Sequence, residues 1–338
     1  MKRPAVLFLD NTSADNLAMA LAATRPSSLL DVKAIFVTGR AAHTDPNASI
    51  EERDEAYSTY IHVLNTLRMA EFMRSAGRTV PVFMGEEVGR TQLRTVVPHG
   101  KHANEEIYDL WSARETSKFD GDFAAGLQFL SQYEGEKLLV LVGGPLTEVA
   151  LIQRYRPDLA VKFGMMFVQA GDFAEDESTN LLGGKGNSFN GACDAKALHD
   201  VLEGHDGEII LLPSNMTKQV ELGFVTPDDI ASLGVYQRLA EVYRVHYEHS
   251  AKRRGTSLYI HDLGLVMLAE QYLQGDQGFP YRYEPVEILD VPYEAPGAGE
   301  QERRGTIVIG PAKAGNRFTV VWQDTDGYRG RVATYLQS

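Results

Sequence analysis

The chain contains almost no cysteine. Its single cysteine, Cys193, cannot form an internal disulfide bond. One thiolate is also too few for the cysteine-rich ligand sets that hold structural zinc. These absences are typical of a protein in a reducing compartment, so we expect a cytoplasmic protein.

Long apolar runs and an excess of positive charge are absent as well. Nowhere do roughly 18 apolar residues follow one another, which argues against a transmembrane helix. The first apolar segment runs straight into Asp10, which leaves no signal-peptide core or cleavage site. The 33 basic and 46 acidic residues give a net charge of −13. Such a surface repels phosphate groups, so the sequence predicts neither a nucleic-acid partner nor a membrane partner.

Glycine-rich phosphate loops are also missing. The first apolar run is not followed by Gly-x-Gly-x-x-Gly, and no Gly-Lys-Ser or Gly-Lys-Thr sequence occurs. A dinucleotide or triphosphate cofactor would therefore lack the backbone cradle that it needs.

What the chain does have is an alternation of short apolar runs with segments of helical period. Its 338 residues, 43% of them hydrophobic, can bury a large core. The apolar runs, which read as buried parallel strands, are 5–9, 32–37, 80–84, 138–142, 165–168 and 209–212. The segments of helical period include 16–23, 49–75, 123–133, 194–202 and 236–251.

This alternation predicts an α/β fold with an open, doubly wound, mainly parallel sheet. The strands become shorter from Val286 to Leu336, which predicts a small antiparallel addition at the C-terminal end. No internal repeat or linker separates a second unit, so we expect one domain spanning residues 1–338.

In such a sheet, ligands bind beyond the carboxyl ends of the strands. Short polar side chains recur just after the predicted strands. The segments that contain them are 10–16, 38–40, 143–148, 169–172, 186–190, 213–217 and 261–262. Oxygen donors gathered at one sheet edge suit a hydroxyl-rich ligand or a hard cation such as calcium.

At these positions the chain resembles the nucleoside hydrolases of the inosine-uridine type. The segment 144–150, Gly-Pro-Leu-Thr-Glu-Val-Ala, is similar to the family's Gly-Pro-Leu-Thr-Asn-x-Ala. Phe189-Asn190, followed by Asp194, resembles its Glu-Phe-Asn stretch and the Asp-Pro-x-Ala-Ala that comes after it. His261-Asp262-Leu263 is similar to its His-Asp-Pro, and Pro98-His99-Gly100 to its His-Gly loop.

The resemblance implies a hydrolase that cleaves the N-glycosidic bond of a ribonucleoside, with calcium holding the attacking water. Cleavage passes through an oxocarbenium-like state, so it needs a water nucleophile, a base for its proton and often an acid for the leaving group. A metal ion would lower the pKa of the water and orient it. By resemblance only, we also expect a homo-oligomer, either a dimer or a tetramer.

The resemblance implies a role for several positions of this chain, some of which carry a different residue type from the family's. The candidate catalytic residues are Asp10, Asp15 and His261. The candidates for binding the nucleoside or related ribosyl ligand are Asn11, Asp15, Arg40, Asn190 and His261. The candidate metal ligands are Asp10, Asn16, Thr147 and Asp262.

The first loop departs from the family pattern Asp-x-Asp-Pro-Gly-x-Asp-Asp. Placing its final pair on Asp15 and Asn16 puts Asn11, an amide that cannot take a proton from water, at the position of the base. A shift of one residue would let Asp10 act as the base instead. Calcium affinity follows the number of charged ligands, so tight calcium binding is not expected.

A second departure concerns the charge of the ligand. Ser188 replaces the glutamate of Glu-Phe-Asn, and Arg40 stands where the family has an asparagine near the sugar. A guanidinium there disfavours a metal ion and favours an anion. One hypothesis is therefore that the ligand is a phosphorylated or otherwise acidic ribosyl compound.

Simpler interpretations stay open beside these. The early aspartates and Asp262 could serve only as helix caps. Tyr243, His246 and Tyr247 could be core residues rather than the lining of a base pocket. For the protein as a whole, the alternative is a catalytically silent homologue that binds a ribosyl ligand without turning it over.

Overall fold

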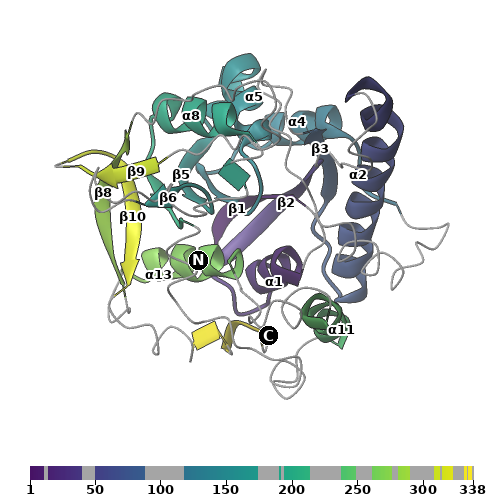
Figure 1. The fold of residues 1–338 in the computed structure, drawn as a ribbon. Coiled ribbons are helices and arrows are strands. Elements are labelled where there is room, and N and C mark those ends of the chain that lie inside the picture. The colour runs from purple at the N-terminus through teal and green to yellow at the C-terminus, as the bar shows by residue number, and fades with distance from the viewer. Residues whose placement is uncertain are drawn as a thin grey trace.

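The structure is a computed structural model, drawn in Figure 1. The residues that it describes are 1–10, 14–39, 50–87, 118–173, 190–191, 194–213, 237–248, 261–275, 281–289, 308–312, 314–322, 331–332 and 334–336.

The described strands form one mixed sheet in the order β3-β2-β1-β4-β5-β7-β10-β8-β9-β6. In chain order they are β1 (Arg3–Leu9), β2 (Leu30–Gly39), β3 (Val82–Glu87), β4 (Leu138–Val142), β5 (Phe163–Val168), β6 (Asp172–Phe173), β7 (Ile209–Leu211), β8 (Tyr281–Leu289), β9 (Val308–Pro311) and β10 (Arg317–Trp322). All neighbouring pairs from β3 to β10 are parallel. The predicted strands are confirmed, because each apolar run overlaps one of these parallel strands.

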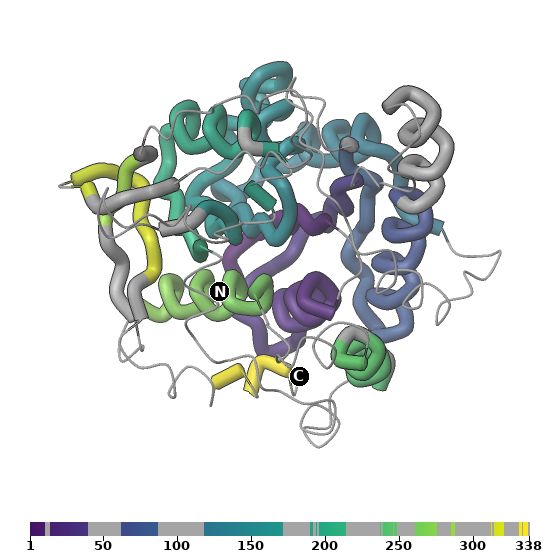
Figure 2. Tube along the Cα trace, viewed as in Figure 1, coloured from purple at the N-terminus to yellow at the C-terminus, as the bar shows by residue number. Residues whose placement is uncertain are grey.

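The C-terminal strands also follow the prediction of an antiparallel addition. Strand β8 pairs antiparallel with both β10 and β9. Strand β10 differs from the expectation in one respect, because its other edge pairs parallel with β7 and so extends the central sheet. Figure 2 shows the first strand inside the molecule and these last strands at one side of it.

Helices cover both faces of the sheet, as a doubly wound fold requires. They are α1 (Ala14–Ala23), α2 (Ile50–Ser75), α4 (Phe123–Ser131), α5 (Thr147–Tyr155), α6 (Pro157–Ala160), α8 (Ala195–Gly204), α11 (Gln237–His246) and α13 (Leu263–Leu273). None of them, in the part of the chain that the structure describes, is long and apolar enough to cross a bilayer.

The core is divided between the two faces of the sheet by the alternation of side chains along each strand. In β1, Leu7 and Leu9 pack with α1, α2, α11 and α13. Val6 and Phe8 point to the other face, where α4, α5, α6 and α8 cover them. Strand β1 is buried on both sides, which explains its unbroken apolar sequence. Helices α1 and α13 lie side by side on the first face (Figure 1).

Candidate functional site

The ends of β1 and β4 form the floor of the candidate site. The backbone N–H of Gly143 donates to the carbonyl of Phe8, which continues the pairing of the two strands past their ends. A methyl group at Gly143 would lie 3.1 Å from Cγ of Asp262 and 3.3 Å from Oδ1 of Asn16. Two predicted site residues therefore flank one glycine, although one comes from each end of the chain.

Asp10 follows β1 directly and is almost completely buried. The side-chain nitrogen of Asn16, in the first turns of α1, donates to Oδ1 of Asp10 over 2.7 Å. A side chain at Gly144 would come within 2.9 Å of Cβ of Asp10. The close approach of Gly144, which follows β4, and the hydrogen bond from α1 together fix the direction of the Asp10 carboxyl group.

Asp15 meets the His261-Asp262 segment, which immediately precedes α13. The backbone N–H of His261 donates to the carboxyl group of Asp15. Burial raises the pKa of Asp15 well above its usual value, the nearby Asp262 carboxylate raises it further, and the His261 hydrogen bond lowers it. Asp15 and Asp262, called the acid pair below, are thus close enough to repel each other. The expected convergence of the early aspartates with the late His-Asp segment is present in the structure.

Tyr243 packs beneath the acid pair. Its ring is completely buried in the core on the α1 face, and among the described residues its hydroxyl has no hydrogen-bond partner. Burial raises the pKa of the Tyr243 phenol well above its usual value, and the charges of Asp15 and Asp262 raise it further. Tyr243 is a core residue, and its hydroxyl lies near the acids.

Thr147 begins α5 and is completely buried. Its hydroxyl donates to Oδ2 of Asp194 over 2.7 Å. The other oxygen of Asp194 accepts the backbone N–H of Ala197 and caps α8. The capping role of Asp194 was not predicted from the sequence, although an aspartate just before a helix is a typical N-cap.

Asn190 joins the loops that follow β4 and β5. Its side-chain nitrogen donates to the carbonyl of Gly143 and to both the carbonyl and side-chain oxygens of Gln169, over 2.7 to 3.1 Å. Its amide nitrogen therefore holds the floor of the site together. Gln169 was not singled out from the sequence, and only its place after an apolar run pointed to it.

Two predicted ligand-binding residues, Asn11 and Arg40, lie outside the described residues. The same is true of Pro98-His99-Gly100 and of Ser188-Phe189. Their roles stay predictions.

Glu148 is a buried acid at this end of the sheet that sequence reasoning did not recognise. It is completely buried, and its Oε1 accepts the backbone N–H of Glu86 over 2.9 Å. Its Oε2 has no partner among the residues described. Burial raises the pKa of Glu148 to about 8, while hydrogen bonds, including that from the backbone N–H of Glu86, oppose the rise.

The described residues do not by themselves supply a calcium site. In the described parts of the chain, no three His, Cys, Asp or Glu side chains come together as a potential metal-binding group. Calcium prefers about six to eight oxygen ligands, and among the predicted ligands only Asp10 and Asp262 are carboxylates, while Asn16 and Thr147 offer neutral oxygens. Two carboxylates and two neutral donors fall short of this number, so the described residues alone do not fit the ion. The metal-ligand roles, including that of Asp262, stay predictions.

Comparison with known proteins gives one family. The sequence model of the inosine-uridine preferring nucleoside hydrolases matches residues 6–329. No curated protein sequence matches the chain significantly.

Solved structures with the same fold include several nucleoside hydrolases. A plant nucleoside hydrolase has a TM-score of 0.68 at 18% identity, covering 100% of this chain and 98% of its own. A purine-preferring ribonucleoside hydrolase from Gardnerella vaginalis has a TM-score of 0.68 at 16% identity, covering 99% of both chains. An inosine-uridine preferring nucleoside hydrolase from Bacillus anthracis has a TM-score of 0.62 at 14% identity, covering 99% of this chain and 100% of its own. At such low identities the structural likeness shows the fold alone.

Proposed function

Because the chain belongs to the inosine-uridine preferring nucleoside hydrolase family, we propose that it hydrolyses the N-glycosidic bond of ribonucleosides or a related ribosyl compound, releasing the base and the pentose. The observation that supports this most is the hydrogen bond from the backbone N–H of His261 to Asp15, with Asp262 near enough to act on the charge of Asp15. It brings two acids and the His261 backbone together at the carboxyl edge of the sheet, where a doubly wound fold binds its ligand.

We assign Asp15 to the sugar. Its carboxyl oxygen Oδ1 is buried and has no hydrogen-bond partner among the described residues. A ribose hydroxyl that donates to this oxygen would stabilise the charged form, which burial and Asp262 disfavour. Binding of the pentose would therefore relieve part of the cost of enclosing this acid.

We assign Asp10 to the attacking water. Its carboxylate is held by Asn16 at the end of β1, so it is oriented in advance. A carboxylate in this position accepts the proton of the water as the oxygen attacks the anomeric carbon.

We assign His261 to the protonation of the leaving base. Its backbone N–H donates to Asp15, so His261 belongs to the same part of the site as the residue assigned to the sugar. An imidazole can give a proton to a leaving nitrogen near neutral pH. This avoids the expulsion of an anionic base.

A reducing-sugar assay over a panel of purine and pyrimidine nucleosides, with calcium and with a chelator, tests the proposal. We expect turnover by the parent protein. Asp10→Asn is expected to lower kcat by at least about 100-fold, and Asp15→Asn to raise KM. Asp158→Asn is the matched control, because Asp158 is an exposed aspartate paired with Arg156.

The same panel distinguishes the alternatives. Adding the 5′-phosphates tests the predicted role of Arg40, since an acidic ligand would then be preferred. Binding of nucleosides without turnover of any substrate would overturn the proposal in favour of a catalytically silent homologue.

A further inference from the structure

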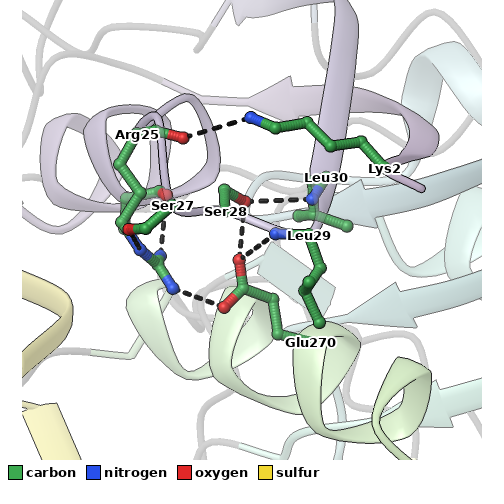
Figure 3. Close-up of polar contacts among 8 residues, drawn as sticks. Lys2, Arg25, Ser27, Ser28, Leu29, Leu30 and Glu270 are labelled. Atoms are coloured by element: carbon green, nitrogen blue, oxygen red, sulfur yellow. Dashed lines mark hydrogen bonds and ion pairs between the residues drawn. The ribbon is translucent and has the colours of Figure 1, made fainter.

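A buried ion pair ties α13 to the segment that follows α1 (Figure 3). Glu270 lies in the third turn of α13, and its side chain is 2% exposed. One of its carboxyl oxygens pairs with the guanidinium of Arg25. The other accepts the hydroxyl of Ser28 over 2.6 Å and the backbone N–H of Leu29 over 3.0 Å. These four residues are called the Glu270 anchor below.

Arg25 is itself fixed by further contacts. Its guanidinium donates to the carbonyl of Ala22, in the last turn of α1, over 2.8 Å. Its Nε donates to the hydroxyl of Ser27, and the ring of Tyr335 lies 4.2 Å from the guanidinium carbon. The Glu270 anchor is therefore joined directly to the carboxyl end of α1 and is covered by the C-terminal segment.

The anchor and the acid pair lie at opposite ends of the same two helices. Asp15 is in the first turn of α1, and Asp262 is the residue just before α13. At a rise of 1.5 Å per residue, Glu270 lies roughly 12 Å along α13 from Asp262. The two helices pack against each other between these ends.

The two ends have opposite electrostatics. At the amino ends, Asp15 and Asp262 repel each other. At the carboxyl ends, Arg25 and Glu270 attract each other within a buried network. Apolar packing alone would hold the helices together but would resist sliding and rotation only weakly, since it is not directional. Hydrogen bonds from three different donors to one carboxylate fix both movements.

We propose that Glu270 is a positioning residue, whose anchor sets the register of α13 against α1 and thereby holds His261 and Asp262 beside Asp15. Because the site that Glu270 would position is the one proposed above, this inference rests on the proposed function. A buried ion pair is weak evidence for stability, because an apolar pair of the same volume often stabilises as well. The hydrogen bonds of the Glu270 anchor are directional, and directional contacts are what fix the position of one helix along another.

Glu270→Gln tests this with little change of shape. A small slide of α13 moves His261, and misplacement of a reacting group by about 1 Å can cost roughly 100-fold in rate. We expect kcat to fall by at least about tenfold while KM stays within about threefold. The measurements are made at a temperature at which circular dichroism shows every variant folded.

A second readout does not depend on activity. Because the N–H of His261 donates to Asp15, amide hydrogen exchange at His261 should become at least about tenfold faster in Glu270→Gln. Ser28→Ala, which removes one donor and keeps the ion pair, should change kcat and exchange in the same direction by a smaller amount. Val201→Ala is the control, because Val201 is buried on the other face of the sheet.

The outcomes separate the two proposals. Faster exchange at His261 in Glu270→Gln but not in Val201→Ala supports the anchor, even if no nucleoside is hydrolysed and the proposed function has failed. Unchanged exchange and unchanged kcat in Glu270→Gln would overturn the anchor. Equal changes in Glu270→Gln and Val201→Ala would also overturn it, because they would reflect a general loss of stability.

Discussion

The side-chain nitrogen of Asn16 donates a 2.7 Å hydrogen bond to Oδ1 of Asp10. This bond joins the end of β1 to the start of α1 and turns an amide toward a carboxylate at the centre of the candidate site. In the alignment that places the final acid pair of the family pattern on Asp15 and Asn16, the family has an acid at the position of Asn16. With two acids a cation would be needed between them, whereas an amide and an acid satisfy each other without one.

Asn16→Asp should therefore make the protein depend on calcium. The substitution replaces the donor to Asp10 with a second carboxylate, which should lower the free energy of unfolding in a chelator by roughly 1–3 kcal/mol. Calcium should restore this loss by binding between the acids. Thermal unfolding of the variant and the parent, with calcium and with chelator, measures the effect. A variant as stable as the parent in chelator would contradict this reading of the bond.

Thr147→Val tests the link between α5 and α8. The substitution removes the hydroxyl that donates to Asp194, a residue that is completely buried. Loss of this partner should lower the free energy of unfolding by about 1–3 kcal/mol. Thr147→Ser keeps the hydroxyl and is the matched control. Urea unfolding of the three proteins compares them, and equal losses in both variants would mean that the hydrogen bond contributes nothing.

Much of the fold could be predicted because its strands are buried on both faces. The run 138–142 has no polar residue, and it forms β4 with the same bounds. Ligands of a doubly wound sheet bind at the carboxyl ends of its strands, which predicted that the loop after β1 and the segment before α13 lie at one edge. Asp15 and His261 meet there. Neither inference needed knowledge of any particular contact between side chains.

The remaining contacts could not be predicted, because they depend on partners distant in the sequence. Nothing in the sequence around Glu270 indicates that it pairs with Arg25. Glu148 likewise looks like an ordinary acid in the first turn of a helix, and only the neighbouring ends of β2 and β3 make it a buried one. Burial of a charged side chain is a property of the assembled fold, so periodicity does not reveal it.

Glu148→Gln should stabilise the protein at neutral pH and flatten its pH dependence. The pKa of Glu148 is raised by burial from its usual 4.5 to about 8. Folding therefore favours the protonated acid, and stability that is fully present below pH 4.5 is lost progressively as the pH rises toward 8. The neutral glutamine keeps an oxygen for the N–H of Glu86 and avoids this loss.

The size of the effect should grow with pH. The gain in the free energy of unfolding for Glu148→Gln should be near zero at pH 4.5 and on the order of 1–3 kcal/mol at pH 8. Urea unfolding of the parent and the variant between these values measures it. Parallel curves for the two proteins would show that Glu148 is not the group responsible.

Gly143→Ala should impair the site without unfolding the protein. The added methyl group would lie 3.1 Å from Cγ of Asp262 and from Sδ of Met19, and 3.3 Å from Oδ1 of Asn16. Each distance is a few tenths of an ångström too short, so the neighbours must move apart. Because Asp262 and Asn16 belong to the site, kcat/KM for nucleosides should fall by at least about tenfold, while stability falls by only about 1 kcal/mol.

Gly164→Ala is the matched control. A methyl group there would be equally crowded, at 3.2 Å from Cβ of Lys137 and 3.4 Å from the carbonyl oxygen of Leu138. Gly164 lies in β5 beside the start of β4. It is therefore at the amino ends of the strands, whereas the site is at their carboxyl ends. Its substitution should cost similar stability and leave kcat/KM within about twofold of the parent. Equal losses of kcat/KM in both variants would mean that crowding at Gly143 acts through the fold and not through the acid that it displaces.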